Sequence, residues 1–551
     1  MRWASGSIVL VVMSCAATAA AVDADPTNYT SVIPTLKPGD TLNLASGTYT
    51  SGMDISGLNG SDSAWITITG PQSGPPAIIE PKSSGCCNNV EITNSSYVAI
   101  RNLTVDSKGM DGIFGISAKG STSNLVHHIT VEGCTVTGVG GSQQTVGIST
   151  KAPTWGWVIR GNRILGPGTG MYLGNSNGAD PFIAGLIENN LIQDPIGYCM
   201  QIKYQQPRPD VPGIPTGDST TIIRHNVFIK NDQPSPDGDR PNLLLGGFPD
   251  SGPGSNDLYQ VYGNFFFHNP RESLMQASGR VSIHDNIFVD ADGAAMRLQN
   301  HDLPLKLAHV YNNTIYSTKS GIAFGNLPSQ EHQVIGNLVF SDTPITGSPT
   351  NANGNMTDTV ANAAAYVNAP SSTLGSMDFY PLAGKCEGAA LDLSSVSAQA
   401  DYDRDFNSTS KAGFTFRGAY AGAGVNPGWK LGADIKAAGS AGAAGSGGSA
   451  AGGAGGSGGS SAGGAGGGGG AGQGGKAGAG GAGGGSAGAA GTGASAGQGG
   501  AAGQAATPSD GSDSGGCGCR TSGSSSRTWL ALMIAAAALG MRMRRGTSPR
   551  R

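Results

Sequence analysis

A short pattern centred on asparagine recurs seven times between residues 159 and 339. In each copy a Val or Ile stands three residues before the Asn, and an Ile, Val or Phe stands two residues after it. The gaps between successive asparagines are 28, 36, 38, 22, 27 and 24 residues. A unit of this length is too short to bury its own apolar face, so the units must stack on one another. The asparagines are Asn162, Asn190, Asn226, Asn264, Asn286, Asn313 and Asn337.

The residues inside each unit predict one coil of a parallel β-helix, which is an all-β solenoid. A second apolar run follows in the unit, as at 200–202 and 296–298, and its apolar and polar residues alternate as in a half-buried strand. Short strands separated by tight turns and repeated every ~25 residues are typical of this fold. We expect coils from about residue 42 to residue 340. The asparagines then form a structural ladder at one corner, because their amides can bond each other along the solenoid.

The two ends of the chain predict export and a tether. Residues 1–21 contain Arg2, an apolar run and a series of small residues, which is the layout of a signal peptide. Residues 22–435 form the predicted β-helix domain with its terminal caps. Residues 436–516 are almost wholly Gly, Ala, Ser and Gln, and such a segment cannot bury enough apolar surface to fold. We predict a disordered linker there.

Residues 517–551 predict a membrane-directed sorting segment. They contain Cys517, Cys519, a 13-residue apolar run from Trp529 to Met541 and an Arg-rich tail. The run is shorter than the ~20 residues that span a bilayer comfortably. This layout resembles the MYXO-CTERM sorting signals of myxobacteria, and the resemblance implies processing near the cysteines and display on the cell surface. A short transmembrane helix that acts as a plain anchor in the cell envelope membrane is the alternative.

Charge and cysteine usage exclude other classes of protein. The formal net charge is −4, and no basic cluster occurs outside the last ten residues, so we expect no nucleic-acid partner. We expect a monomer. The cysteines between the two termini show no zinc-ligand spacing, which leaves core packing or one disulfide near Cys86 or Cys87. They are Cys86, Cys87, Cys134, Cys199 and Cys386.

Irregular spacing of the repeat predicts the position of a site. Gaps of 36 and 38 residues imply insertions at 204–219, 230–241 and 248–258, and insertions on a repeat scaffold often build the binding face. They would wall a groove whose three coils span about 14 Å, roughly three sugar units. Outward positions on the flanking strands are basic or amide. The substrate-binding candidates are Gln201, Arg271, Glu272, Gln299 and His301.

These residue types suit β-elimination of a uronic-acid polymer. The reaction needs a base for the proton beside the carboxylate and a positive group for the charge that develops there. The catalytic candidates are Lys203 as the base, with Arg224 or Arg297 as the charge stabiliser. Aspartates in the insertions make Ca²⁺ a candidate cofactor, although turn chemistry also explains them. For each residue the alternative is an ordinary solvated surface.

Residues 36 to about 340 resemble the right-handed parallel β-helix, or pectate-lyase-like, superfamily of carbohydrate-active proteins. Within it, the chain resembles polysaccharide lyase family 6, which contains chondroitinase B and alginate lyases. Met200-Gln201-Ile202-Lys203 stands where that family places a strand ending in its catalytic Lys, and residues 222–228 and 262–266 resemble its next coils. The chain departs from the family in two places. Asp194 is the only acidic residue shortly before Lys203, and residues 242–247 contain no Arg.

Two functions follow from these observations. The first is a polysaccharide lyase-like enzyme acting on an acidic polysaccharide. The alternative is a non-catalytic carbohydrate-binding or adhesive surface protein. A glycosidase needs paired carboxylates, and the outward strand positions are basic and amide instead, so this reading ranks last.

Overall fold

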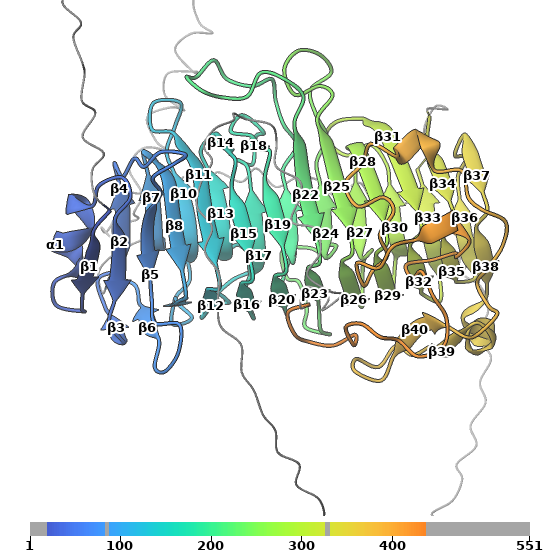
Figure 1. Cartoon of the computed structure of the whole chain (residues 1–551). Coiled ribbons are helices and arrows are strands. Elements are labelled where there is room, and N and C mark those ends of the chain that lie inside the picture. The colour runs from blue at the N-terminus through green and yellow to red at the C-terminus, as the bar shows by residue number, and fades with distance from the viewer. Residues whose placement is uncertain (1–18, 83–86, 326–330, 437–551) are drawn as a thin grey trace, which may run out of the picture. The chain divides into compact units, whose positions relative to one another are not determined.

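The computed structural model describes residues 19–82, 87–325 and 331–436. They form three long parallel sheets, A, B and C, wound as a right-handed parallel β-helix (Figure 1), which confirms the predicted fold class. The predicted signal peptide, linker, Cys517, Cys519 and C-terminal apolar segment lie almost entirely outside the described residues. Within the described ranges, no helix has both the length and the apolar character needed to cross a membrane.

Sheet A has thirteen strands and receives one strand from each coil. They are β1 (Ala21–Ala24), β2 (Thr41–Leu44), β5 (Ile66–Thr69), β8 (Ser95–Arg101), β11 (Val126–Glu132), β15 (Val158–Arg160), β19 (Leu186–Glu188), β22 (Thr220–Arg224), β25 (Leu258–Tyr262), β28 (Gly279–His284), β31 (Leu305–Tyr311), β34 (Gln333–Ile335) and β37 (Asn351–Asn353).

Sheet B follows sheet A in each coil and has twelve strands. They are β3 (Gly47–Tyr49), β6 (Ala77–Ile79), β9 (Leu103–Asp106), β12 (Thr135–Thr137), β16 (Arg163–Leu165), β20 (Leu191–Gln193), β23 (Val227–Ile229), β26 (Phe265–Asn269), β29 (Ile287–Ala291), β32 (Thr314–Tyr316), β35 (Leu338–Phe340) and β38 (Met356–Asp358).

Sheet C completes each coil and has eleven strands. They are β4 (Met53–Ser56), β7 (Cys87–Thr93), β10 (Ile113–Lys119), β13 (Val146–Lys151), β17 (Thr169–Leu173), β21 (Met200–Ile202), β24 (Leu243–Leu245), β27 (Met275–Ala277), β30 (Ala294–Leu298), β33 (Ser320–Phe324) and β36 (Thr343–Thr346).

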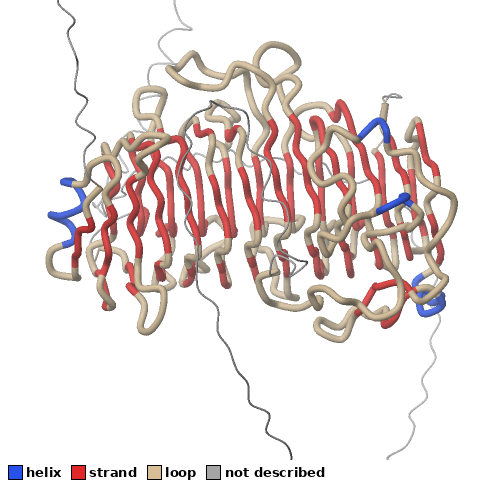
Figure 2. The backbone as a smooth tube through the Cα atoms, viewed as in Figure 1, coloured by secondary structure: helices blue, strands red, loops and turns tan. Residues whose placement is uncertain are grey.

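Short elements complete the fold, as the secondary-structure colours of Figure 2 show. Tyr29 and Ile33 come from the helical turns before β2 and pack into the core of the first coils. The short elements are α1 (Tyr29–Val32), η1 (Ile33–Thr35), β14 (Thr154–Trp155), β18 (Phe182–Ile183), η2 (Val360–Ala365), β39 (Val367–Ala369), β40 (Asp378–Pro381), η3 (Ser394–Val396) and η4 (Ala412–Phe414).

The repeated asparagines form a continuous ladder at the corner between sheets A and B. The Oδ1 atom of Asn264 accepts from the backbone N–H of Asn226 at 2.9 Å and from its Nδ2 at 3.0 Å. The other members repeat these contacts, and Asn355 adds an eighth rung. The residue before each Asn has a positive φ, such as +57° at His225, which turns the chain sharply into sheet B.

Residues 360–436, here called the C-terminal segment, cover the outer faces of sheets A and B in the later coils (Figure 1). On sheet B, outward Val227 and Phe265 are buried in one cluster with Phe379 and Tyr420 of this segment. On sheet A, the backbone N–H of Ala400 donates to the Gln260 side chain, and Gln399 bonds Tyr311 and His309.

The last described residue fastens this segment to the solenoid. The Nζ atom of Lys436 donates to the carbonyl oxygens of Gly263 at 2.7 Å and Phe406 at 2.5 Å, and to Nδ1 of His225 at 3.1 Å. The same ammonium lies 3.5 Å from the centre of the Phe406 ring. The segment therefore ends beside the middle coils rather than beyond the last coil.

The described cysteines other than Cys87 lie inside the fold as reduced thiols. They are Cys134, Cys199 and Cys386, and all are buried. Burial raises the pKa of Cys134 and of Cys386 to about 12. The backbone N–H of Cys134 donates to Asn162, so this thiol occupies the first position of the asparagine ladder. Cys86 lies outside the described residues, so a disulfide there stays a prediction.

Candidate functional site

The three insertions are attached to the edges of sheet C. Residues 204–219 and 248–257 leave the carboxyl ends of β21 and β24, and residues 230–241 lead into the amino end of β24. The outer face of sheet C in these coils is therefore framed by long loops on both sides. The C-terminal segment packs on sheet B there and on only part of sheet A, where a hollow stays open beside Arg280 and His309.

Four of the candidate residues, Gln201, Lys203, Arg297 and Gln299, lie on this outer face. Gln201 and Arg297 belong to one row across β21, β24, β27 and β30, which Leu244 and Gln276 complete. Their neighbours Met200, Ile202, Met296 and Leu298 are in the core, so the row points outward. Lys203 and Gln299 stand two residues further along β21 and β30 and share that orientation. Lys203 and Arg297 are separated by three coils, about 14 Å along the solenoid.

Lys203 belongs to a compact cluster of charged groups at the carboxyl edge of sheet C. Its side chain is only 9% exposed, and its Nζ atom lies 3.5 Å from Oδ2 of Asp302. The same ammonium is 5.0 Å from the centre of the Tyr204 ring. Nδ1 of His301 lies 3.1 Å from the same Asp302 oxygen. The bond from His301 and the charge of Lys203 hold the pKa of Asp302 below its usual value.

The turn that carries His301 and Asp302 reaches back over an open stretch of the face. A Cβ atom placed on Gly247 would lie 2.5 Å from Cβ of Leu303, so only glycine allows this approach. Asp302 itself has a φ of +56°, and His301 pairs with Leu303 across the tight turn. Asp302 was not among the sequence candidates, because it lies in an aperiodic turn three coils after Lys203.

The structure does not bring Arg224 to Lys203. Arg224 ends β22 on sheet A, whereas Lys203 follows β21 on sheet C. Its guanidinium contacts Glu188 at 2.8 Å, Tyr262 at 3.1 Å and Asp401 at 3.3 Å. It continues a row of alternating charge along sheet A that contains Arg101, Glu132, Arg160 and Glu188. Its charge is neutralised within that row, so the pairing of Arg224 with Lys203 is corrected.

Arg271 and Glu272 lie at the opposite, amino edge of sheet C. Arg271 donates to the carbonyl oxygen of Gln233 at 3.0 Å and approaches Asp239 at 4.0 Å, so it holds the 230–241 insertion. Glu272 accepts from the backbone N–H of Ser273 at 2.8 Å. These two candidates therefore flank the outer face and do not join the Lys203 cluster.

The aspartates of the insertions do not converge on a calcium site. Asp257 pairs with Arg208, Asp232 with His268, and Asp250 with Lys306. Across residues 19–82, 87–325 and 331–436, no three His, Cys, Asp or Glu side chains are grouped so as to hold a metal ion. The described carboxylates therefore assign no Ca²⁺ site, and the chemistry below routes no step through a metal ion.

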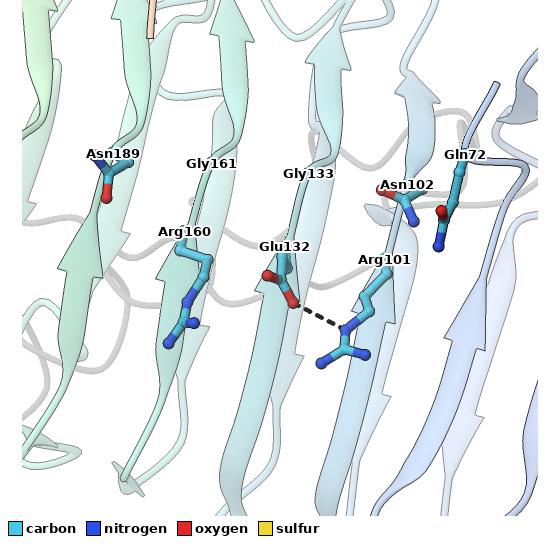
Figure 3. Close-up of a pocket in the computed structure, with 8 residues that line it drawn as sticks. All are labelled: Gln72, Arg101, Asn102, Glu132, Gly133, Arg160, Gly161 and Asn189. Carbon is cyan, nitrogen blue, oxygen red and sulfur yellow. Dashed lines mark ion pairs between the residues drawn. The ribbon is translucent and has the colours of Figure 1, made fainter. Parts of the chain in front are cut away.

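Two hollows occur on sheet A and contain none of the candidate residues. The first has a volume of about 570 Å³ and lies over the charged row, where Arg101 pairs with Glu132 at 2.9 Å (Figure 3). Gly133 and Gly161 leave its floor without side chains. The second, of about 530 Å³, is lined by Arg280 and His309 and bordered by the C-terminal segment. Each arginine of the first hollow pairs with a glutamate of the charged row, Arg101 with Glu132 and Arg160 with Glu188, which fits a structural role.

Comparison with known proteins bears on the fold. No protein-family model and no curated protein sequence matches the chain. An alginate lyase from Paenibacillus sp. str. FPU-7 is 16% identical, over 61% of this chain and 95% of that one, with a TM-score of 0.31. A family 6 polysaccharide lyase from Pseudopedobacter saltans is 13% identical, over 62% and 93%, with a TM-score of 0.39.

A third solved structure is the A-module of a mannuronan C-5 epimerase from Azotobacter vinelandii. It is 13% identical, over 60% of this chain and 93% of that one, with a TM-score of 0.39. The sheet topology of the chain itself defines its class as a parallel β-helix. Its similarity to these solved lyases and epimerases is limited to the values given and concerns the fold alone.

Proposed function

We propose that this protein binds an acidic polysaccharide along the outer face of sheet C and cleaves it by β-elimination beside Lys203. One observation carries the proposal. Lys203, Asp302 and His301 form a charged cluster on the one sheet face that has long insertions at both edges. A polymer needs an extended face of this kind, and in the same coils the C-terminal segment packs on sheet B and on part of sheet A.

The geometry assigns a different role to each member of the cluster. Lys203 lies 3.5 Å from Asp302, and a cation paired with a carboxylate in this way suits binding and neutralising the uronate carboxylate. When Nδ1 of His301 donates to Asp302, the lone pair of the ring is on Nε2, which makes His301 the better base. This assignment moves the role of base from Lys203 to His301.

The proposed step is balanced within substrate and cluster. Nε2 of His301 takes the proton from the carbon beside the carboxylate, while Lys203 stabilises the negative charge that builds on the carboxylate oxygens. The electron pair left on that carbon forms a double bond to the next ring carbon, and the glycosidic oxygen leaves and receives a proton from solvent. Gln299 and Arg297 lie further along the same face and are placed to bind neighbouring sugars.

A digestion panel tests the proposal. The full-length protein is incubated with alginate, pectate and glycosaminoglycans, and the ultraviolet absorbance of unsaturated uronide ends is followed. We expect product from at least one polymer, and about 100-fold slower formation by His301→Ala. His268→Ala is the matched control, since His268 also pairs with an aspartate, at 2.7 Å from Asp290, but lies on sheet B. Absence of product from every polymer refutes the lyase.

Binding without cleavage is the second candidate function, and the ion pair between Lys203 and Asp302 favours it. A cation fixed by a neighbouring carboxylate can bind an anionic sugar without taking a proton. This function predicts retention on immobilised uronate polymers, weaker retention of Lys203→Ala, and unchanged retention of His301→Ala. The two functions differ in the effect of His301, because only the lyase needs a base.

Export and display at the cell surface complete the proposal. They rest on the sequence of residues 1–21 and 517–551, with Cys517 and Cys519 as the processing region. Protease added to intact cells should remove the β-helix domain from the surface, and Cys517→Ser/Cys519→Ser should change its distribution between cells and medium. A protein found only inside the cell contradicts this part.

A further inference from the structure

The row that contains Lys203 extends across earlier coils of sheet C. Lys119 and Lys151 are register partners on β10 and β13. The next strand, β17, pairs with β13 through Tyr172 and with β21 through Leu173, so Gly174 lies between Lys151 and Lys203. Lys151 and Lys203 are therefore two coils apart, about 10 Å along the solenoid. No side chain occupies the row between them.

Lys151 shares one feature with Lys203, an aromatic ring beside its ammonium group. Its ammonium lies 4.1 Å from the centre of the Tyr172 ring, as that of Lys203 lies 5.0 Å from the Tyr204 ring. Lys151 and Tyr172 are both half-buried, so each keeps accessible surface on the outer face. The ring attracts an ammonium held at its face, and the ammonium offers N–H donors that a carboxylate can accept.

We propose that Lys151 and Tyr172 form a second carboxylate-binding subsite, two coils before Lys203. This inference rests on the proposed function and specifies the class of substrate. If three coils span three sugar units, the distance of about 10 Å between Lys151 and Lys203 corresponds to two sugar units. The preferred substrate is therefore a uronate polymer that presents carboxylates on the same side at every second sugar. Filling both subsites needs at least three consecutive sugars.

Lys119 provides an internal comparison for this subsite. It belongs to the same row, but its Nζ atom lies 3.6 Å from Oε1 of Glu91 and its side chain is 50% exposed. A carboxylate of the protein thus already neutralises Lys119 in part. We expect the substrate to gain little from this lysine, and removal of its charge serves as a control for general loss of positive charge.

Calorimetric titration with uronate oligosaccharides of two, four and six units tests the subsite. Full-length protein carrying His301→Ala is used, so that cleavage during the titration is slowed about 100-fold. Adding Lys151→Met should weaken binding of the tetra- and hexasaccharides about tenfold, as expected for one lost hydrogen bond between charged groups. Binding of the disaccharide, which cannot reach both subsites, should be unchanged. Adding Lys119→Met should change every affinity less than twofold.

The outcomes separate this inference from the function on which it rests. Equal losses for Lys151→Met and Lys119→Met, or a loss that is the same for all three lengths, overturn the second subsite while leaving the proposed function intact. If the protein binds no uronate oligosaccharide and releases no unsaturated product, both fail. Circular dichroism of each variant establishes that the coils are still folded.

Discussion

The asparagine ladder allows a stability prediction whose size follows from individual hydrogen bonds. In Asn264→Ala, the backbone N–H and Nδ2 of Asn226 lose their shared acceptor, at 2.9 and 3.0 Å. The carbonyl oxygen of Ile223 and the Oδ1 atom of Asn286 lose a donor, each at 2.9 Å. A buried polar group left unsatisfied costs about 1–3 kcal/mol. Because some of these atoms keep a second partner, we expect a total loss of about 3–5 kcal/mol.

The end of the same ladder supplies the control. Asn355 is only partly buried and has one Asn neighbour, Asn337, with bonds of 2.9 and 3.0 Å. Water can reach the groups that Asn355→Ala exposes, so its cost should be about 1 kcal/mol. Guanidinium denaturation followed by far-ultraviolet circular dichroism compares the variants, and hydrogen exchange should show lost protection at the Asn226 amide of Asn264→Ala. Equal destabilisation of both variants, with that amide still protected, would refute the reasoning.

Three further predictions concern the charges that fasten the fold. Lys411→Met removes the 2.6 Å ion pair with Asp285, which is 2% exposed on both sides, and leaves this carboxylate with His284 as its remaining charged-group partner at 2.9 Å. Denaturation should show a loss of about 3–5 kcal/mol. Burial lowers the pKa of Lys436 from 10.5 to about 7. Between these two pH values the unfolded chain binds a proton that the folded chain does not, so thermal stability should rise with pH in that window. Lys436→Met should flatten the rise. Hydrogen bonding to Asp290 raises the pKa of His268. The nuclear magnetic resonance titration midpoint of His268 should therefore lie above pH 6.5, and it should move down in Asp290→Asn. Stabilisation of the fold by this ion pair should be lost as pH rises through the raised pKa.

The coils could be predicted from sequence because their determinants are local. Alternating apolar residues define each strand, and a residue with positive φ before each Asn defines each corner, as Gly161 does before Asn162. The same local rule explains why the eighth rung was missed. Asn355 is flanked by Ala352 and Thr357 instead of large apolar residues, so the pattern disappears while the hydrogen bonds remain.

The site was harder to predict because it depends on which sheet each strand joins. Lys203 and Arg224 are separated by 21 residues, but the 204–219 insertion carries the chain from sheet C to sheet A between them. No local feature of the sequence shows that change. The contact of Asp302 with Lys203 spans 99 residues and depends on Gly247, which lets the turn lie flat on the sheet. Neither residue carries a pattern that points to the other.

The covering of sheet B in the later coils has a signal in the sequence. Later strands of this sheet are apolar on both faces, as in Val227-Phe228-Ile229, and a strand of this kind must be covered on both sides. The C-terminal segment supplies that cover and is fixed by buried polar groups such as Lys436 and Lys411. In the same coils, sheet C instead presents Gln201, Gln276 and Arg297 outward. Polar side chains on an extended face between long loops are what the proposed binding of a polar polymer requires.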